Sequence, residues 1–423
     1  MDKIIINGSK PLNGIVEVSG MKNAAVAVIF ATILVGDKCV LENLPNISDV
    51  TCALEILKNM GMSVRYLTDD TVEIDSSNVR CGSSDENLVS KMRASYYIIG
   101  AELGRFGRSY VALPGGCDFG VRPIDQHIRG FEALGADVVV DDNFVTCNTE
   151  SGRTIGGDIF FDVNTVGGTI NVILAAARAK GNTVIENAAK EPHVVDVCNF
   201  LNNCGAKISG AGTDTIKIKG VDNLHGCSYT IIPDMIEAGT YMIAVAAAGG
   251  KLQINNIIPK HLESLSSKLE EMGVSITEDD DFVIVSSDKD QLKRVNIKTL
   301  PYPGFPTDLQ PQICPLLCLA HGTSFLNESV WENRFKYVDE LLKMGANIKI
   351  NGRTAIIQGP TKFRGAEVYA RDLRAGASMI IAGLCAEGTT EIGNIHFIER
   401  GYDNIVGKLS QVGADIRVES FPD

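Results

Sequence analysis

The sequence predicts an α/β protein made of six copies of one unit, arranged as two domains of three copies each. A short signature recurs six times: an apolar residue, two intervening residues, a second apolar residue, glycine, and a small or apolar residue. Successive glycines of this signature are 74, 70, 68, 72 and 68 residues apart, and they are Gly61, Gly135, Gly205, Gly273, Gly345 and Gly413. A near-constant spacing of this kind indicates an internal repeat.

Each copy contains the same elements in the same order. An Ala-rich apolar helix comes first, as in Ala238–Gly250 and Ala377–Gly388, and glycine ends it because glycine tolerates the left-handed cap conformation. A short strand, an amphipathic helix that ends in the signature, and a hairpin follow; Asn351-Gly352 is the clearest hairpin turn. Helices between short strands are typical of an α/β domain.

The sixth copy stops one strand short, after Ala414–Ser420, whereas the first residues supply a strand with no helix before it. We therefore expect the N-terminal strand to complete the sixth copy. This predicts a discontinuous domain of residues 1–21 plus 232–423, which carries copies four to six. Residues 22–231 then form an inserted domain, which carries copies one to three.

Length and composition favour a soluble protein of more than one domain. A chain of 423 residues is too long for one core, and its longest apolar run, Ala24–Val35, is too short to span a bilayer. No secretory signal opens the sequence, and eleven scattered cysteines favour reduced thiols in a cytosol. A net charge of −13 argues against nucleic acid as a partner. We expect a cytoplasmic protein that meets any anionic ligand with a local cluster of Arg and Lys.

The stretch Leu113–Ile128 is a Gly-rich loop that holds one thiol, Cys117, with Arg122, Asp125 and His127 after it. A thiol beside a cation can have a lowered pKa and act as a nucleophile or an acid. The alternative for such a loop is a β-turn with a bystander cysteine.

Charged and hydroxyl residues recur where the helices begin. The entries to the six Ala-rich helices carry Lys22-Asn23, Arg93, Thr165-Val166-Gly167, Asp234, Thr307-Asp308, and Asp372 with Arg374. The starts of the second helices carry Arg122, Arg334 and Arg400, or Glu191 with His193 in one copy. Asp and Thr are ordinary N-caps, and a lone surface Arg or His is more often solvated or structural.

Cations at helix N-termini oppose the macrodipole, at a cost of roughly 0.3–1 kcal/mol each. Several such cations in an acidic chain suggest that anionic groups bind among them, as in a phosphorylated carboxylate or a nucleotide diphosphate. The sequence has no GxxxxGK[ST] motif, so a P-loop is excluded. It has neither HExxH nor paired cysteine ligands, and we expect no catalytic metal.

Specific motifs then give a resemblance. With the cysteine loop, Pro306–Asp308, Glu332–Arg334, Asp372–Ala375 and Glu399–Tyr402 in place, the chain resembles the enolpyruvyl transferases from Lys3 to about Glu419. Within that family it is most similar to the UDP-N-acetylglucosamine 1-carboxyvinyltransferases. The resemblance implies two inside-out α/β barrel domains, each of three similar units, with a cleft between them.

The resemblance also implies a reaction, the first committed step of peptidoglycan synthesis. The enolpyruvyl group of phosphoenolpyruvate joins the 3-hydroxyl of UDP-N-acetylglucosamine and phosphate leaves, with no cofactor. Cys117 resembles the acid that protonates the methylene carbon and the target of fosfomycin, and Asp308 resembles the base. Lys22, Arg122 and Arg400 resemble the phosphoenolpyruvate clamp, with Lys22 and Arg400 counted as catalytic. The other residues implied to bind substrate are Asn23, Arg93, Pro123, Ile124, Asp125, Gln126, Thr165, Val166, Gly167, Val330, Arg334, Asp372 and Arg374.

The chain departs from the family pattern at two positions. His193 stands where Glu commonly follows Glu-Pro, and Met235 stands where Arg commonly follows Asp. Two alternatives remain open. One is 5-enolpyruvylshikimate-3-phosphate synthase, which lacks the cysteine loop, and the other is a catalytically silent paralogue that binds UDP-N-acetylglucosamine and regulates a partner.

Overall fold

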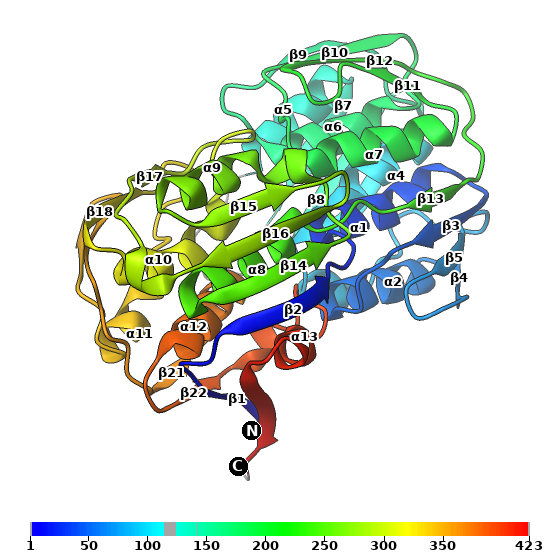
Figure 1. Ribbon diagram of the computed structural model, residues 1–423. Helices are drawn as coiled ribbons and strands as arrows, with labels where there is room; N and C mark the ends of the chain where they lie inside the picture. Colours follow the sequence, from blue (N-terminus) through cyan, green and yellow to red (C-terminus); the bar gives the residue numbers. More distant parts are fainter. Residues whose placement is uncertain (1, 114–123, 142, 422–423) are drawn as a thin grey trace. The chain divides into compact units, whose positions relative to one another are not determined.

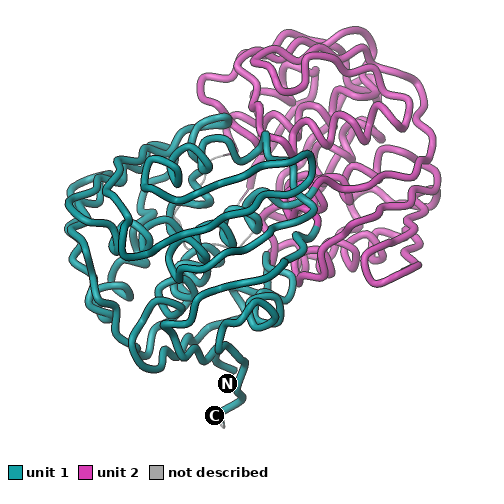
Figure 2. The backbone as a smooth tube through the Cα atoms, viewed as in Figure 1, with its two compact units in different colours: residues 1–19, 233–423 teal, residues 20–232 magenta. Residues whose placement is uncertain are grey.

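The computed structural model describes residues 2–113, 124–141 and 143–421 (Figure 1). It divides into two compact units: unit 1 is residues 1–19 with 233–423, and unit 2 is residues 20–232 (Figure 2). Both units mix helices with small sheets, so the predicted α/β class is confirmed.

Unit 2 contains copies one to three. Its sheets have the strand orders β13-β3-β5-β4, β6-β8-β7 and β11-β12-β10-β9. The strands are β3 (Lys38–Glu42), β4 (Ser63–Tyr66), β5 (Val72–Asp75), β6 (Arg108–Ala112), β7 (Ala136–Val140), β8 (Phe144–Thr149), β9 (Asp158–Phe160), β10 (Asn182–Glu186), β11 (Lys207–Ser209), β12 (Thr215–Lys219) and β13 (Ser228–Thr230). The helices are α1 (Lys22–Ala31), η1 (Thr32–Leu34), α2 (Ser48–Asn59), α3 (Glu86–Val89), η2 (Arg93–Tyr96), α4 (Tyr97–Phe106), α5 (Asp125–Ala133), α6 (Val166–Ala176) and α7 (Pro192–Asn203), where η marks a 3₁₀ helix.

Unit 1 contains copies four to six. Its sheets have the strand orders β15-β16-β14-β2, β17-β18-β20-β19 and β21-β22-β1-β23. The strands are β1 (Asp2–Asn7), β2 (Leu12–Glu17), β14 (Gly250–Asn255), β15 (Ser275–Glu278), β16 (Phe282–Ser287), β17 (Ile297–Lys298), β18 (Gly322–Asn327), β19 (Ile348–Asn351), β20 (Thr354–Gly359), β21 (Glu367–Tyr369), β22 (Thr389–Gly393) and β23 (Asp415–Ser420). The helices are α8 (Met235–Ala248), η3 (Pro259–Leu262), α9 (Glu263–Glu271), η4 (Lys289–Gln291), η5 (Thr307–Leu309), α10 (Gln310–Leu319), α11 (Val338–Lys343), α12 (Leu373–Cys385), η6 (Ile395–Phe397) and α13 (Ile405–Gln411).

The Ala-rich helices form the core of each unit. Every residue of α8 is buried, and α8, α10 and α12 pack on one another. In unit 2, α4 packs on both α1 and α6. The described strands form six separate sheets, three in each unit, as the predicted repeats require. These sheets close no barrel. Within the described residues, no helix is both long and apolar enough to cross a membrane.

The repeated signature is a helix C-cap. All six signature glycines have a positive φ, between 80° and 104°, which disfavours any residue with a Cβ. At the end of α2, the N–H of Gly61 donates to the carbonyl of Lys58, and the N–H of Met62 donates to the carbonyl of Leu57. This bond pair is the Schellman motif, in which the residue after glycine packs on the apolar residue five positions before it. The signature therefore has apolar residues at these two positions.

The N-terminal strand belongs to a sheet of unit 1. β1 lies between β22 and β23 and is antiparallel to both, with Ile4 opposite Ile392 on one side and Val418 on the other. This is the position that β5 takes between β3 and β4 in unit 2. β2 pairs in parallel with β14, so both N-terminal strands contribute to the sheets of unit 1.

Candidate active site

In unit 1, two arginines hold the carboxylate of Asp308, which lies in η5 directly before α10. Oδ1 of Asp308 accepts from Nη2 of Arg334 at 3.2 Å, and Oδ2 accepts from Nη2 of Arg374 at 3.1 Å. The side chains of both arginines are buried, whereas the side chain of Asp308 is 32% exposed. The carboxylate is therefore the part of this cluster that a substrate can reach.

Arg374 is a fixed positive charge within this cluster. Burial alone would lower the pKa of its guanidinium, but the charge of Asp308 and the neighbouring Tyr402 raise that pKa above its usual value. The guanidinium carbon lies 5.6 Å from the ring centre of Tyr402. Gln312 links the two sides of the cluster, because its Nε2 donates to the carbonyl of Asp308 at 2.7 Å and to the hydroxyl of Tyr402 at 3.1 Å.

Glu328 is a buried carboxylate that the sequence analysis missed. One oxygen accepts from the backbone N–H groups of Val330 and Trp331, at 2.8 and 3.0 Å. The other accepts from the hydroxyl of Thr307 at 3.0 Å. One side chain therefore fixes both the turn that carries Val330 and the turn that carries Asp308. No motif in the sequence marks it, because its partners are backbone groups and the hydroxyls of Thr299 and Thr307, which are distant in sequence.

Three other residues at helix entries act as N-caps. Asp372 accepts from the N–H groups of Arg374 and Ala375, and Asp234 accepts from those of residues 236 and 237. Thr165 accepts from the N–H of Gly168 at 3.1 Å. For Asp372 and Thr165, which the sequence analysis assigned to substrate binding, the structure shows a capping contact.

In unit 2, His127 of α5 contacts Asn171 of α6 and the first turn of α6. Nδ2 of Asn171 lies 2.8 Å from Nδ1 of His127 and donates to the carbonyl of Tyr96 at 3.0 Å. The ring of Tyr96 meets that of His127 edge-on, with centroids 4.9 Å apart. A Cβ on Gly167 would lie 2.7 Å from the Tyr96 hydroxyl and 3.1 Å from Nε2 of His127. Glycine is thus required there by the close approach of both rings.

This network sets the state of His127. The amide of Asn171 can only donate through Nδ2, so Nδ1 of His127 is the acceptor and the ring proton lies on Nε2. Burial, followed by the charge of Arg93, lowers the pKa of His127 to about 4. The imidazole is therefore neutral at pH 7 and turns an N–H edge toward Gly167.

Two of the three predicted cations of unit 2, Lys22 and Arg93, have partners within the unit. Nζ of Lys22, the first residue of α1, lies 2.7 Å from Oδ2 of Asp49, and both side chains are mostly buried. Arg93 begins η2, and its guanidinium carbon lies 5.7 Å from the ring centre of Tyr96. Neighbouring groups therefore hold both cations in place. Sequence spacing gave no sign of Asp49 as a partner.

The remaining predicted residues are placed as follows. Cys117, Arg122 and Pro123 lie outside the described residues. Ile124 is the N-cap residue of α5, and Asp125 and Gln126 are its first two residues, joined by a 2.9 Å hydrogen bond from Nε2 of Gln126 to Oδ2 of Asp125. Arg400 is half-buried in the turn between η6 and α13, and Asn23 is half-buried in α1. The two departures, His193 and Met235, are buried in the first turns of α7 and α8.

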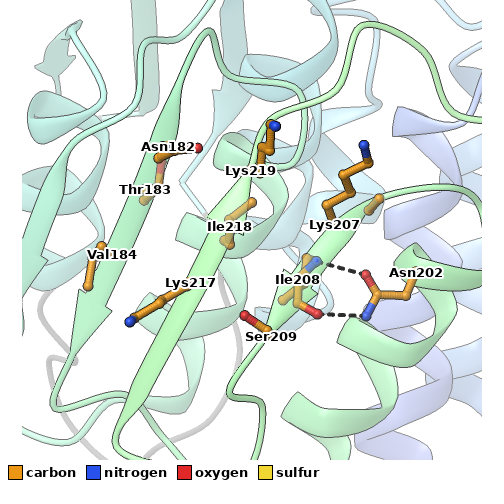
Figure 3. Close-up of a pocket in the computed structure, with 11 residues that line it drawn as sticks. Asn182, Thr183, Val184, Asn202, Lys207, Ile208, Ser209, Lys217, Ile218 and Lys219 are labelled. Carbon is orange, nitrogen blue, oxygen red and sulfur yellow. Dashed lines mark hydrogen bonds between the residues drawn. The ribbon is translucent and has the colours of Figure 1, made fainter.

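A surface hollow of about 690 Å³ lies on the β10–β12 sheet of unit 2 (Figure 3). Its lining includes Lys207, Lys217 and Lys219 but has no carboxylate, imidazole or thiol. At its edge, the side-chain amide of Asn202 donates to the carbonyl of Ile208 and accepts from the N–H of Ile208, each at 2.9 Å. The hollow therefore lacks a general acid or base and contains none of the predicted site residues.

Two comparisons with known proteins cover almost the whole chain. Residues 6–409 match the family described as EPSP synthase (3-phosphoshikimate 1-carboxyvinyltransferase). A Clostridium botulinum protein named UDP-N-acetylglucosamine 1-carboxyvinyltransferase is 58% identical over 417 residues, covering 98% of this chain and 99% of its own. A Clostridium acetobutylicum protein named UDP-N-acetylglucosamine 1-carboxyvinyltransferase 2 is 56% identical over 422 residues, covering 100% of both chains.

Solved structures have the same fold. The enolpyruvyl transferase NikO from Streptomyces tendae gives a TM-score of 0.89 at 26% identity, covering 100% of this chain and 99% of its own. EPSP synthase from Acinetobacter baumannii gives a TM-score of 0.75 at 16% identity, covering 99% and 100%, which supports the fold alone. Sequence and fold agree: the chain belongs to the EPSP synthase (3-phosphoshikimate 1-carboxyvinyltransferase) family of enolpyruvyl transferases.

Proposed function

We propose that this chain transfers the enolpyruvyl group of phosphoenolpyruvate to the 3-hydroxyl of UDP-N-acetylglucosamine and releases phosphate. The observation that carries the proposal is the carboxylate of Asp308, held by one buried arginine on each oxygen. Relatives at 56–58% identity named for this acceptor support the choice of substrate.

Asp308 is the proposed base. The two guanidinium groups favour its ionised form, which is the form that accepts a proton. As the sugar oxygen bonds to C2 of phosphoenolpyruvate, the hydroxyl proton passes to Asp308, and Cys117 gives a proton to the methylene carbon C3. The product of this step is a tetrahedral adduct.

Elimination completes the reaction. The bond from C2 to the phosphate oxygen breaks, and the leaving phosphate takes the proton held by Asp308. C3 returns a proton to the thiolate of Cys117, which restores the double bond as an enolpyruvyl ether. The sequence of steps is redox-neutral. Cys117 serves as the acid in the first step, and its loop is the feature that separates this chain from 5-enolpyruvylshikimate-3-phosphate synthase.

The cations at helix starts bind the anionic substrates in this proposal. Lys22, Arg122 and Arg400 hold phosphoenolpyruvate. Arg93, the Thr165–Gly167 turn and Val330 contribute to binding the UDP-sugar. A bound anion would offset the cost of placing Lys22 and Arg93 at helix N-termini.

The proposed reaction also implies a place in the cell, and the fold implies two domains. Transfer to UDP-N-acetylglucosamine would place the chain in the cytoplasm, at the first committed step of peptidoglycan synthesis and as a target of fosfomycin. The two compact units are the proposed domains, with the N-terminal strands closing the sheets of unit 1.

Phosphate release by the purified protein tests the proposal. Phosphoenolpyruvate with UDP-N-acetylglucosamine should give steady release, while phosphoenolpyruvate with shikimate 3-phosphate should give none. The reverse result would identify a 5-enolpyruvylshikimate-3-phosphate synthase. Binding of UDP-N-acetylglucosamine with no release in either mixture would indicate the catalytically silent paralogue.

A further inference from the structure

Three cysteines of unit 2, none of them among the proposed active-site residues, converge on one point. The Sγ atoms of Cys39, Cys204 and Cys227 all lie within 4.8 Å of one another, and those of Cys204 and Cys227 are 3.4 Å apart. The three are distant in sequence: Cys39 lies in β3, Cys204 caps the C-terminus of α7, and Cys227 directly precedes β13. All three are free thiols.

Backbone hydrogen bonds fix this arrangement. The carbonyl of Cys227 accepts from the N–H of Val40 at 2.9 Å, beside the parallel pairing of β13 with β3 (Figure 1). The carbonyl of Cys204 accepts from the N–H of His225, also at 2.9 Å. Each cysteine is thus tied to a segment that carries another, so the three sulfurs need little movement to share a ligand.

We propose that Cys39, Cys204 and Cys227 form a site for a soft, thiophilic metal ion with three thiolate ligands, of which monovalent copper is the representative. This site is independent of the proposed transferase reaction. It lies within unit 2 and uses none of the residues assigned to that reaction.

The spacing of the sulfurs suits such an ion. At the usual metal–sulfur distance of about 2.3 Å, three sulfurs around one ion lie about 4 Å apart, within the range that the three thiols occupy. Among the described residues, no imidazole nitrogen or carboxylate oxygen joins the group. Hard ions such as Mg²⁺ want oxygen ligands, and structural zinc is four-coordinate, so three thiolates alone favour a soft ion of lower coordination.

The site is reachable from one side. Cys39 and Cys204 are fully buried, whereas Cys227 is partly exposed, so an ion would enter past Cys227. On binding, sulfur–copper bonds form and the thiol protons pass to the buffer. Copper remains monovalent, so the step needs no oxidant or reductant.

The test is an anaerobic titration of monovalent copper into the full-length protein, in competition with bathocuproine disulfonate. The background carries Cys117→Ala, so that the thiol of the Gly-rich loop takes no part. We expect one equivalent of tightly bound copper. Changing a supporting residue of a metal site weakens binding by about 10–100-fold, so loss of a direct ligand in Cys227→Ser should weaken it by more than about 100-fold.

The matched control is Cys81→Ser, which removes another half-buried thiol of unit 2 and should leave copper affinity unchanged. Circular dichroism of metal-free Cys227→Ser establishes that it folds. X-ray absorption on the unsubstituted cluster gives a second readout, and three sulfur neighbours around copper are expected. Equal affinity in Cys227→Ser, coordination by two sulfurs, or failure to take copper from the chelator would each overturn the proposal. A disulfide between Cys204 and Cys227 in place of copper uptake would do the same.

Discussion

The two units carry opposite charges at corresponding positions of the same repeat. At the entries to the Ala-rich helices, unit 1 has Asp234, Asp308 and Asp372, whereas unit 2 has Lys22 and Arg93 in two copies and a threonine in the third. An acid at a helix N-terminus is favourable by roughly 0.3–1 kcal/mol, and a cation there is unfavourable by a similar amount. Unit 1 therefore gains stability from these positions. In unit 2 the charge of Lys22 is met by Asp49, while Arg93 at the start of η2 would favour an anion.

Within unit 1, the three acids at the helix entries differ in the groups that they contact. Asp234 and Asp372 each accept two backbone N–H groups of their helices. Asp308 instead has an arginine on each oxygen and a partly exposed carboxylate. Three acids at one repeat position thus lie in two different environments, and we propose a catalytic role for Asp308 alone.

The largest effect should come from unit 2. We expect Cys117→Ala to lower turnover at least about 10³-fold, in the upper part of the range for loss of a general acid. Binding of UDP-N-acetylglucosamine, measured by calorimetry, should persist. Cys81→Ala is the control and should keep full turnover; a Cys117 variant that does the same would remove the thiol from the mechanism.

His127 should make the stability of unit 2 depend on pH. Its pKa is lowered from 6.5 to about 4 in the folded chain, so between these values the unfolded chain binds a proton that the folded chain does not. The free energy of unfolding should fall by about 3 kcal/mol as pH drops through this window. The measurement is chemical denaturation of the wild type and His127→Asn. Asn can still accept from Asn171, and parallel pH profiles for the two proteins would contradict the assignment.

In unit 1, we expect Glu328 to contribute to stability through its hydrogen bonds to backbone N–H groups. Glu328→Ala leaves the part-buried N–H groups of Val330 and Trp331 without their acceptor, which should cost about 1–2 kcal/mol of unfolding free energy. Glu328→Gln keeps one oxygen and should cost much less. Because Glu328 fixes the turn of Val330, we expect the alanine variant to raise KM for UDP-N-acetylglucosamine. Equal stability of the two variants would argue against this role.

The smallest effects should come from the caps. Thr165→Ala and Asp372→Ala each remove one N-cap acceptor, so each should lower the free energy of unfolding by about 1 kcal/mol. Thermal unfolding of the two variants checks this. If neither variant lost stability, the two caps would not contribute to the free energy of unfolding.

Much of the fold could be predicted because the repeat signature has a local cause. Its glycines need a positive φ at all six helix ends, and the Schellman bond pair is present at five of them, so these helix ends are visible in the sequence. The N-cap alternatives for Asp372 and Thr165 could be named for the same reason, since a cap depends on residues two or three positions away. The separation of the described strands into six small sheets could not be derived in this way, because it depends on how distant strands pair.

The candidate site was less predictable where its contacts are long-range. Nothing in the sequence pairs Lys22 with Asp49, or Asn171 with His127, because these contacts depend on the packing of separate helices. Glu328 was missed because its partners include backbone groups. The three converging cysteines follow no metal-binding spacing, since strand pairing brings their segments together.

The most direct test of Asp308 as the base compares Asp308→Asn with Asp372→Asn. Asp308→Asn keeps the shape of the side chain but cannot take the hydroxyl proton, so turnover should fall by about 10²–10⁴-fold while UDP-N-acetylglucosamine still binds. Asp372→Asn keeps a capping oxygen and should retain most of its turnover. Single-turnover phosphate release from phosphoenolpyruvate and UDP-N-acetylglucosamine measures both. We expect the large loss of turnover in Asp308→Asn alone. Equal turnover in the two variants would contradict the assignment of Asp308 as the base.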